Sequence, residues 1–257
     1  MANTRDSFVR FSNRQRLEHL VMMIAFTTLT LTGLPQKYPD AGWANWIVSH
    51  LGGIDMTRAV HRAFGLVLAF IALQHIGIMV GALVLGRARA TMLITRQDFR
   101  DAVDNLKYCL GLLPKPPKFD RFDYKQKWEY WGLLFGGVVM VMTGFVLWYP
   151  TLATKLLPGV VIPTAKVLHT NEAMLALLAV VVWHIYGAHL SPEVFPADTS
   201  IFTGRISAER MKHEHTLEYQ RVAGAEAADE DQDEAGGAAE GAKPAPAKEK
   251  DEAPIAS

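Results

Sequence analysis

The chain has 257 residues, of which 50% are hydrophobic and 20% are charged, and its formal net charge is zero. The hydrophobic residues gather in four long runs separated by charged stretches, which favours a membrane protein over one or two soluble domains. The zero net charge averages a basic front half against an acidic tail and is itself uninformative. The single cysteine, Cys109, excludes a disulfide framework, a CxxCH attachment site for c-type haem and a cysteine-bound iron–sulfur cluster within this chain.

The first apolar run covers about residues 17–34 and follows four arginines in the first sixteen residues. No small-residue cleavage site of a signal peptide follows, and the run is long enough to cross a bilayer. We therefore expect a retained transmembrane helix after a cytoplasmic N-terminus of residues 1–16. In the next stretch, Trp43 and Trp46 predict a short helix on the membrane surface, with His50 as a surface residue.

The second apolar run covers about residues 58–86, and the chain from 87 to 127 is markedly basic. By the positive-inside rule, this basic segment and the N-terminus lie on the cytoplasmic side. Within the segment, Thr95 and Asp98 predict the capped start of a short amphipathic helix that packs on the membrane or on a partner subunit. Its apolar residues recur at helical spacing: Phe99, Val103, Leu106 and Leu110.

The third run, about residues 128–149, has aromatic residues at both ends and no histidine. A short outward loop, residues 150–163, leads to the fourth run at about residues 166–189. Residues 190–221 are polar and cytoplasmic, and residues 222–257 form an acidic, alanine- and glycine-rich tail that we expect to be disordered. The predicted fold is an all-α integral membrane four-helix bundle over residues 17–189, with both termini cytoplasmic.

Histidines recur within these apolar runs at matching depths. His169 and His184 are fifteen residues apart, so along one helix they lie roughly 22 Å apart within one broad face. His61 and His75, fourteen residues apart, also share a face. Because both helices enter from the outer side, His61 and His169 are level, and His75 and His184 lie deeper, at the level of His19.

An ionisable side chain inside a bilayer is expensive and indicates function. Two histidines that face each other across a bundle at one depth can ligate a b-type haem, so the pattern predicts two stacked haems b. At the inner level, His19 and His75 are alternative partners of His184. Arg58 and Arg62 flank the outer level, where they either anchor the helix at the membrane surface or pair with haem propionates.

The sequence resembles the cytochrome b (gamma) subunit of membrane formate dehydrogenases and, more closely, the related cytochromes b that accompany multihaem c-type cytochromes. The resemblance covers roughly residues 8–220 and all four helices. It is carried by RFSNRQRLEHLVMMIAFTTLTLTGLP, AVHRAFG, RFDYKQKWEYWG, LHTNEAMLALL with WHIYGAH, and SPEVFPADTSIFTGRIS. It implies a respiratory-chain protein of the bacterial inner membrane that passes electrons between quinone and a periplasmic cytochrome c or iron–sulfur subunit.

The resemblance implies that His61 and His169 hold the outer haem and that His19 and His184 hold the inner haem. The chain departs from the family in having His75 and in spacing the histidines of its fourth helix by fifteen rather than fourteen residues. One extra residue turns the lower ligand by about 100°. The pair His75 with His184 would then resemble the cytochrome b of quinol–cytochrome c oxidoreductases, so both inner pairings stay open.

In the formate dehydrogenase family, a quinone contacts the inner haem near the start of the third helix. The matching stretch here is FDYKQK, with Asp123, Lys125, Gln126 and Lys127 as candidates. A second candidate is Glu172, three residues after His169 on a similar face of the helix, where a carboxylate would accept a quinol proton.

Three functions are consistent with these patterns. The first is a dihaem cytochrome b that acts as the electron-transfer subunit of a quinone-linked oxidoreductase. The second is a haem-containing membrane anchor without a quinone site of its own, and the third is a haem-free proton-relay membrane protein. The expected partners are the lipid bilayer and a redox protein, and no nucleic acid is expected to bind. The absence of GxGxxG, GxxxxGK[ST] and HExxH sequences agrees with chemistry done by bound metal centres.

Overall fold

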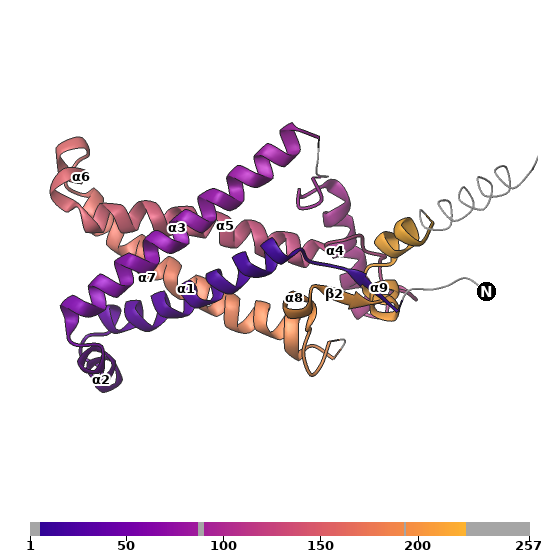
Figure 1. Ribbon diagram of the computed structural model, residues 1–257, viewed down its shortest axis with the longest axis horizontal. Coiled ribbons are helices and arrows are strands. Elements are labelled where there is room, and N and C mark those ends of the chain that lie inside the picture. The colour runs from indigo at the N-terminus through magenta and orange to yellow at the C-terminus, as the bar shows by residue number, and fades with distance from the viewer. Residues whose placement is uncertain (1–5, 87–89, 193, 225–257) are drawn as a thin grey trace, which may run out of the picture.

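The computed structural model describes residues 6–86, 90–192 and 194–224. Four long helices dominate it (Figure 1): α1 (Asn13–Lys37), α3 (Ile54–Val84), α5 (Tyr124–Trp148), and α7 (Val161–Leu178) continued by two π-helical segments, η1 (Ala179–His184) and η2 (Tyr186–Leu190). Each of the four is long and apolar enough to cross a membrane. The predicted all-α, four-helix membrane fold is therefore confirmed.

Two of the long helices begin in polar sequence because capping residues precede the apolar run. Ser12 caps α1, where the Gln15 backbone N–H donates to the Ser12 hydroxyl over 3.3 Å. Asp123 caps α5 in the same way, accepting from the Gln126 backbone N–H over 2.7 Å. Hydrophobicity marks the part of a helix suited to hydrocarbon, whereas capping decides where the helix starts. The capped helices α1 and α5 accordingly start at residues 13 and 124, ahead of the runs predicted from residues 17 and 128. The helices α3 and α7 also start ahead of their predicted runs, at residues 54 and 161 instead of 58 and 166.

The helices form two packed pairs, α1 with α3 and α5 with α7, and α7 also touches α1. At one end of the bundle, called the α2 end, lie α2 (Gly42–His50) and α6 (Pro150–Leu156) (Figure 1). The helix α2 confirms the predicted short helix between the first two spans. The predicted loop at residues 150–163 instead contains α6, which Pro150 starts from the first helical position, where proline is favoured.

The opposite end, called the sheet end, carries α4 (Arg96–Cys109), α8 (Ser200–Thr203), α9 (Ala208–Glu214) and two short strands. The strands β1 (Ser7–Val9) and β2 (Arg205–Ser207) pair antiparallel, with Phe8 opposite Ile206. Phe8, Ile206 and Met211 form a small buried cluster. Three-residue strands carry no usable periodicity, so the sequence did not predict this sheet. It holds the N-terminal and C-terminal segments at the same end of the bundle.

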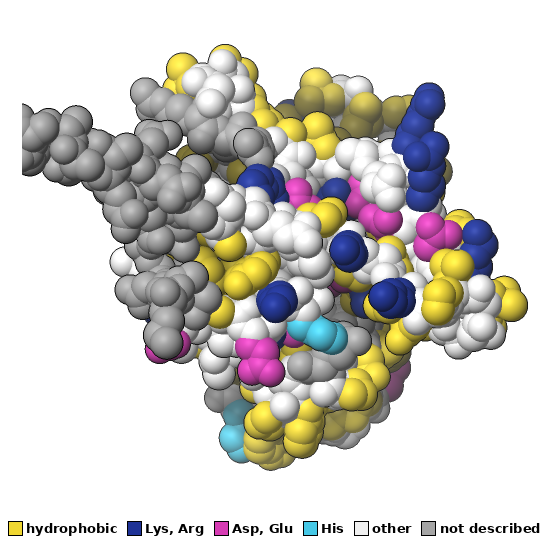
Figure 2. Space-filling model, turned by 90° about the vertical axis from the view of Figure 1, so that its right-hand side faces the viewer, with side chains coloured by type: hydrophobic (Ala, Val, Ile, Leu, Met, Phe, Trp, Pro, Cys, Tyr) yellow, Lys and Arg dark blue, Asp and Glu magenta, His cyan; other side chains and the backbone are white. Residues whose placement is uncertain are grey.

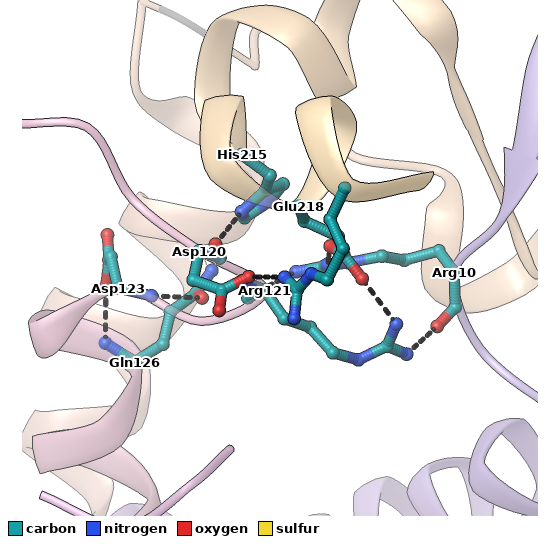
Figure 3. A network of polar contacts seen from close by, with 8 residues as sticks. Arg10, Asp120, Arg121, Asp123, Gln126, His215 and Glu218 are labelled. Carbon is teal, nitrogen blue, oxygen red and sulfur yellow. Dashed lines mark hydrogen bonds and ion pairs between the residues drawn. The ribbon is translucent and has the colours of Figure 1, made fainter. Parts of the chain in front are cut away.

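A buried ionic network joins three distant parts of the chain at the sheet end (Figure 3). Glu218 accepts hydrogen bonds of 2.7 Å from both Arg10 and Arg121. Arg10 is only 4% exposed. Burial lowers the pKa of the Arg10 guanidinium to about 10, against the opposing attraction of Glu218. Residues 10, 121 and 218 are thereby fixed to one another, which anchors the chain before α1, before α5 and after α9.

The helix α4 packs across the start of α5, and its predicted cap is confirmed. The Thr95 backbone N–H and hydroxyl both donate to Asp98, at 2.6 and 2.8 Å. Lys127 of α5 donates to both carboxylate oxygens of Asp98, at 2.7 and 3.0 Å. Burial alone would raise the pKa of Asp98, but the Lys127 and Thr95 hydrogen bonds outweigh it and hold the pKa below its ordinary value. Phe99 meets Trp128 edge to face, with ring centroids 5.7 Å apart.

The C-terminal part of the chain is helical from residue 216 to residue 224. The predicted disordered acidic tail, apart from residues 222–224, lies outside the described residues.

Candidate functional site

The two histidines predicted at the outer level face each other in the half of the bundle near the α2 end. His61 of α3 and His169 of α7 have ring centroids 6.3 Å apart, with ring planes at 71°. The Nδ1 atom of His61 lies 2.9 Å from the Thr32 hydroxyl of α1, and the Nδ1 atom of His169 lies 2.9 Å from the Thr143 hydroxyl of α5. Each ring is therefore held by the helix that packs beside its own.

A second histidine pair lies in the half of the bundle near the sheet end. His19 of α1 and His184, the last residue of η1, have ring centroids 6.0 Å apart, with ring planes at 38°. The Nδ1 atom of His184 lies 2.5 Å from Oε1 of Glu129 in α5. The Nδ1 atom of His19 is buried and makes no hydrogen bond within the part of the chain that the structure describes.

His75, the alternative partner of His184, is engaged elsewhere. Its Nε2 atom lies 3.1 Å from the Tyr130 hydroxyl, and its Nδ1 atom lies 3.4 Å from a carboxylate oxygen of Glu18. Glu18 is buried in α1 and also accepts a 2.7 Å hydrogen bond from Arg14. The structure thus brings His19, and not His75, to His184.

The π-helical continuation of α7 explains why the fifteen-residue spacing does not turn His184 away from α1. The Ile185 backbone N–H donates to the Val180 carbonyl, and the Ser191 N–H donates to that of Tyr186, both in the i to i−5 pattern. A π-turn holds one residue more than an α-turn. We attribute the position of His184, which faces His19 of α1, to this wider turn, because it accommodates one more residue than a regular α-turn.

Both pairs fit the axial ligands of a haem b. A metal–imidazole bond is about 2 Å long and the ring centroid lies about 1.1 Å further on, so opposed axial rings have centroids roughly 6 Å apart. The observed 6.3 and 6.0 Å agree with this separation. Glycines adjoin the outer rings: a Cβ atom at Gly33 would lie 3.0 Å from Cε1 of His61, and one at Gly144 would lie 3.4 Å from Cε1 of His169.

The two candidate arginines, Arg58 and Arg62, lie on the first turns of α3 at the α2 end, and both are exposed. The Arg62 guanidinium lies over the Trp148 ring, 5.4 Å from its centroid. Neither arginine forms an ion pair with another of the described residues. Both stay available for a lipid headgroup or a propionate.

The four candidates of the FDYKQK stretch lie together at the start of α5 and already have structural partners. Asp123 and Gln126 form the capping box, Lys125 lies 3.7 Å from Asp123, and Lys127 binds Asp98. Burial raises the pKa of the Asp123 carboxyl, partly opposed by hydrogen bonds from the Gln126 and Lys125 backbone and by the charge of Lys125.

Glu172 lies away from that stretch, in the half of the bundle near the α2 end. Its carboxylate sits against Gly136 of α5, so closely that a Cβ atom at Gly136 would collide with it. Among the described residues no ion-pair partner of Glu172 is found. An intramembrane carboxylate with these surroundings is typical of a functional position.

Sequence reasoning missed the residues that hold the histidine rings. The outer threonines are each followed by a glycine, as Thr32-Gly33 in LTG and Thr143-Gly144 in MTG. This repeated dipeptide inside two apolar runs was the available signal. Glu129 carried a weaker signal, since it is an acidic residue at the start of a span that otherwise has no charge from residue 128 to residue 148.

The chain is similar to cytochrome b subunits of formate dehydrogenases. The cytochrome b556(fdo) subunit of formate dehydrogenase from Escherichia coli K12 is 25% identical over 223 residues, which cover 85% of this chain and 94% of the relative. The nitrate-inducible formate dehydrogenase cytochrome b556(Fdn) subunit of the same organism is 22% identical, over 88% of this chain and 96% of the relative. A formate dehydrogenase cytochrome b556 subunit from Haemophilus influenzae is 25% identical over 70% of each chain.

A family model described as prokaryotic cytochrome b561 matches residues 10–202, which include all four spans and both histidine pairs. A cytochrome b of this kind is a multi-pass membrane electron carrier that binds haem b, in agreement with the four spans and the facing imidazoles. The chain therefore belongs to the prokaryotic cytochrome b561 family.

Proposed function

We propose that this protein is a dihaem cytochrome b subunit that carries electrons between membrane quinone and a redox partner on the outer side of the bacterial inner membrane. In this proposal, His61 with His169 hold one haem b and His19 with His184 hold the other. The observation that carries it is that α7 and its π-helical continuation present two histidines, each facing an imidazole of another helix at 6.3 or 6.0 Å. The family supports haem b as the cofactor.

When bound, haem b would supply a one-electron carrier. The chain's own residues hold and orient the rings. Thr32, Thr143 and Glu129 contact the Nδ1 atoms and leave the Nε2 atoms for iron. In the proposal, Arg58 and Arg62 at the α2 end pair with propionate groups.

The basic sheet end is proposed to be cytoplasmic, which places both termini inside by the positive-inside rule. Figure 2, which looks onto this end, has Lys and Arg side chains spread across it. His61 and His169 would then be nearer the periplasm, and the α2 end would meet the partner. A dehydrogenase iron–sulfur subunit fits the names of the relatives, and a multihaem cytochrome c is the other candidate.

Quinone is proposed to react in the membrane at one of two places. The first is beside the inner pair at the start of α5, near Asp123 and Lys125. The second is at Glu172, whose intramembrane carboxylate would accept a quinol proton. A haem-containing anchor without a quinone site is a second candidate function, because Asp123, Gln126 and Lys127 already serve capping and an ion pair. Membership in a cytochrome family gives no support to the haem-free alternative.

The first test counts haem by pyridine haemochromogen spectroscopy on the purified chain, produced with an adequate haem supply. We expect two b-type haems per chain. His61→Ala or His169→Ala should remove one haem, and His19→Ala or His184→Ala should remove the other. His75→Ala is the matched control and should keep both. Loss of a haem from the His75→Ala protein, with both retained in the His19→Ala protein, would overturn the inner assignment.

The second test adds a short-chain quinol to the oxidised protein and follows haem reduction by absorbance. Glu172→Gln and Lys125→Ala are compared with wild type at equal haem content. A reduction rate that falls at least tenfold in one variant locates the quinone site. Wild-type haem that the quinol does not reduce would favour the anchor without a quinone site.

A further inference from the structure

The outer histidines are oriented by an arrangement that occurs twice. On α1, the Thr32 hydroxyl lies 2.9 Å from Nδ1 of His61 and 2.6 Å from the backbone carbonyl of Thr28. On α5, the Thr143 hydroxyl lies 2.9 Å from Nδ1 of His169 and 2.6 Å from the carbonyl of Val139. Thr32 is 2% exposed and Thr143 is 8% exposed.

The double contact decides which ring nitrogen carries the proton. A threonine hydroxyl has one proton to donate, and a carbonyl oxygen can only accept. Each hydroxyl therefore donates to its helix carbonyl and accepts from the Nδ1–H of the histidine. With the proton on Nδ1, the lone pair lies on Nε2, which is the nitrogen left for a metal.

The following glycine completes the arrangement. Gly33 and Gly144 each lie beside the Cε1 atom of the ring that the preceding threonine holds, and at Gly33 a Cβ atom would come within 3.0 Å. A side chain at Gly33 would therefore require the His61 ring or the helix to shift. Each Thr-Gly pair thus holds a ring by its Nδ1 atom and leaves space at its edge.

The inner histidines have different acceptors. His184 faces a carboxylate, with Nδ1 2.5 Å from Oε1 of Glu129, and the Nδ1 atom of His19 has no acceptor among the described residues. A carboxylate that accepts from Nδ1–H makes the imidazole a more basic, more electron-donating ligand than a hydroxyl does. Such a ligand favours the oxidised state of a bound iron.

We propose that these hydrogen-bond acceptors are positioning residues that make the two haem sites unequal. At the first site, Thr32-Gly33 holds His61 and Thr143-Gly144 holds His169, so that the Nε2 atom of each ring is left for the haem iron. Glu129 does the same for His184 and lowers the reduction potential of the second site. This inference rests on the proposed ligation by His61 with His169 and His19 with His184, and it adds the groups that control it.

The threonine part is tested by haem retention during dilution of the detergent-purified protein. Thr32→Val and Thr143→Val keep the side-chain shape and remove the acceptor, so we expect 10- to 100-fold weaker retention of one haem, roughly as for other groups that orient metal ligands. Thr143→Ser restores the hydroxyl and should restore retention. The control is Thr28→Val, one turn from Thr32, because among the described residues the Thr28 hydroxyl hydrogen-bonds to the Ile24 carbonyl alone.

The glutamate part is tested by redox titration of the haem absorbance, with electron paramagnetic resonance to distinguish the two centres. Glu129→Gln replaces the carboxylate by a neutral acceptor. At a fixed ambient potential we expect the reduced-to-oxidised ratio of one haem to rise roughly tenfold, about 59 mV for a one-electron couple, with the other unchanged. Tyr130→Phe, next in sequence and in contact with His75, is the control and should move neither potential.

The possible failures are distinguishable. A folded wild-type protein without haem would refute the proposed function. The inference would be overturned, with the proposed function intact, if two haems bind but Thr32→Val and Thr143→Val do not change their retention. It would likewise be overturned if Glu129→Gln does not change their reduction potentials. If the Glu129→Gln protein does not accumulate, the two reduction potentials of the wild-type protein are compared instead. The haem that remains in His19→Ala is the one held by His61 and His169, and it must have the higher potential. The opposite order refutes the inference.

Discussion

His75 lies at the depth of the inner histidines, yet both of its ring nitrogens already contact Tyr130 and Glu18. His19 has the same depth, and its ring faces His184 at 6.0 Å. Depth in the membrane therefore selects candidates, but the direction of the ring and its neighbours decide between them. Hydrogen bonds to both ring nitrogens leave His75 without a free lone pair for a metal. In none of the four paired histidines do the described residues bond to both Nδ1 and Nε2.

His215, at the sheet end, makes the stability of that end dependent on pH. It is 5% exposed, and its Nδ1–H donates to the Asp120 carbonyl over 3.0 Å. Burial, helped by the nearby positive charge of Arg10, lowers the pKa of His215 to about 4. Between pH 6.5 and pH 4 the unfolded segment therefore binds a proton that the folded one excludes, and folding weakens as pH falls.

The expected loss of stability of the sheet end across this pH window is at most about 3 kcal/mol. Hydrogen exchange of the β1 and α9 amides, measured at several pH values, should show faster local opening towards pH 4. His215→Gln should flatten that dependence. The same pH dependence in His215→Gln as in wild type would assign the effect to another group.

At the scale of single elements, the π-helical continuation of α7 determines which helix His184 faces. Deleting one residue from it, such as Val181, returns the spacing from His169 to fourteen and allows a regular α-helix. We expect His184 to keep facing His19, because a π-turn differs from an α-turn by one residue. The deletion variant should bind as much haem as wild type, while inserting one alanine at the same place should remove one haem. Loss of haem on deletion would show that the π-turn has another role.

The amphipathic helix α4 presents an apolar face that is largely exposed within the described part of the chain. Val103, Leu106 and Leu110 are each more than half exposed, and they continue the surface that begins at Phe99 and Trp128. Trp128 stands at the start of a membrane span, where tryptophan favours the interface. Continuity with that residue predicts that α4 lies on the bilayer surface with this face in the lipid.

The single native cysteine makes this prediction straightforward to check. In a Cys109→Ser background, spin labels at residues 103 and 106 should collide more with oxygen than with a water-soluble nickel chelate in liposomes. Labels at Gln97 and Asp104, on the opposite side of the helix, should show the reverse. Equal exposure to the chelate at all four positions would mean that lipid does not cover this face.

At the scale of the whole molecule, the network around Glu218 holds the N-terminal segment, the start of α5 and the C-terminal helix together. Glu218→Gln leaves the buried Arg10 without a counter-charge, which should cost about 3–5 kcal/mol in the stability of the sheet end. Thermal unfolding in detergent measures this, with the exposed Glu209→Gln as control. Equal melting of both variants would mean that the network does not stabilise the fold.

The sequence by itself determined the four spans, the matching depths of the histidines and the pairing of His61 with His169. These follow from hydrophobic run length and from the rise and rotation of a helix, which are local properties. The tertiary structure decided the partner of His184, because a π-turn changes rotation without an unambiguous sequence mark. It also decided that Thr32, Thr143 and Glu129 orient the rings and that β1 pairs with β2. Those contacts join residues 26 to about 200 positions apart, so only the packed chain brings them together.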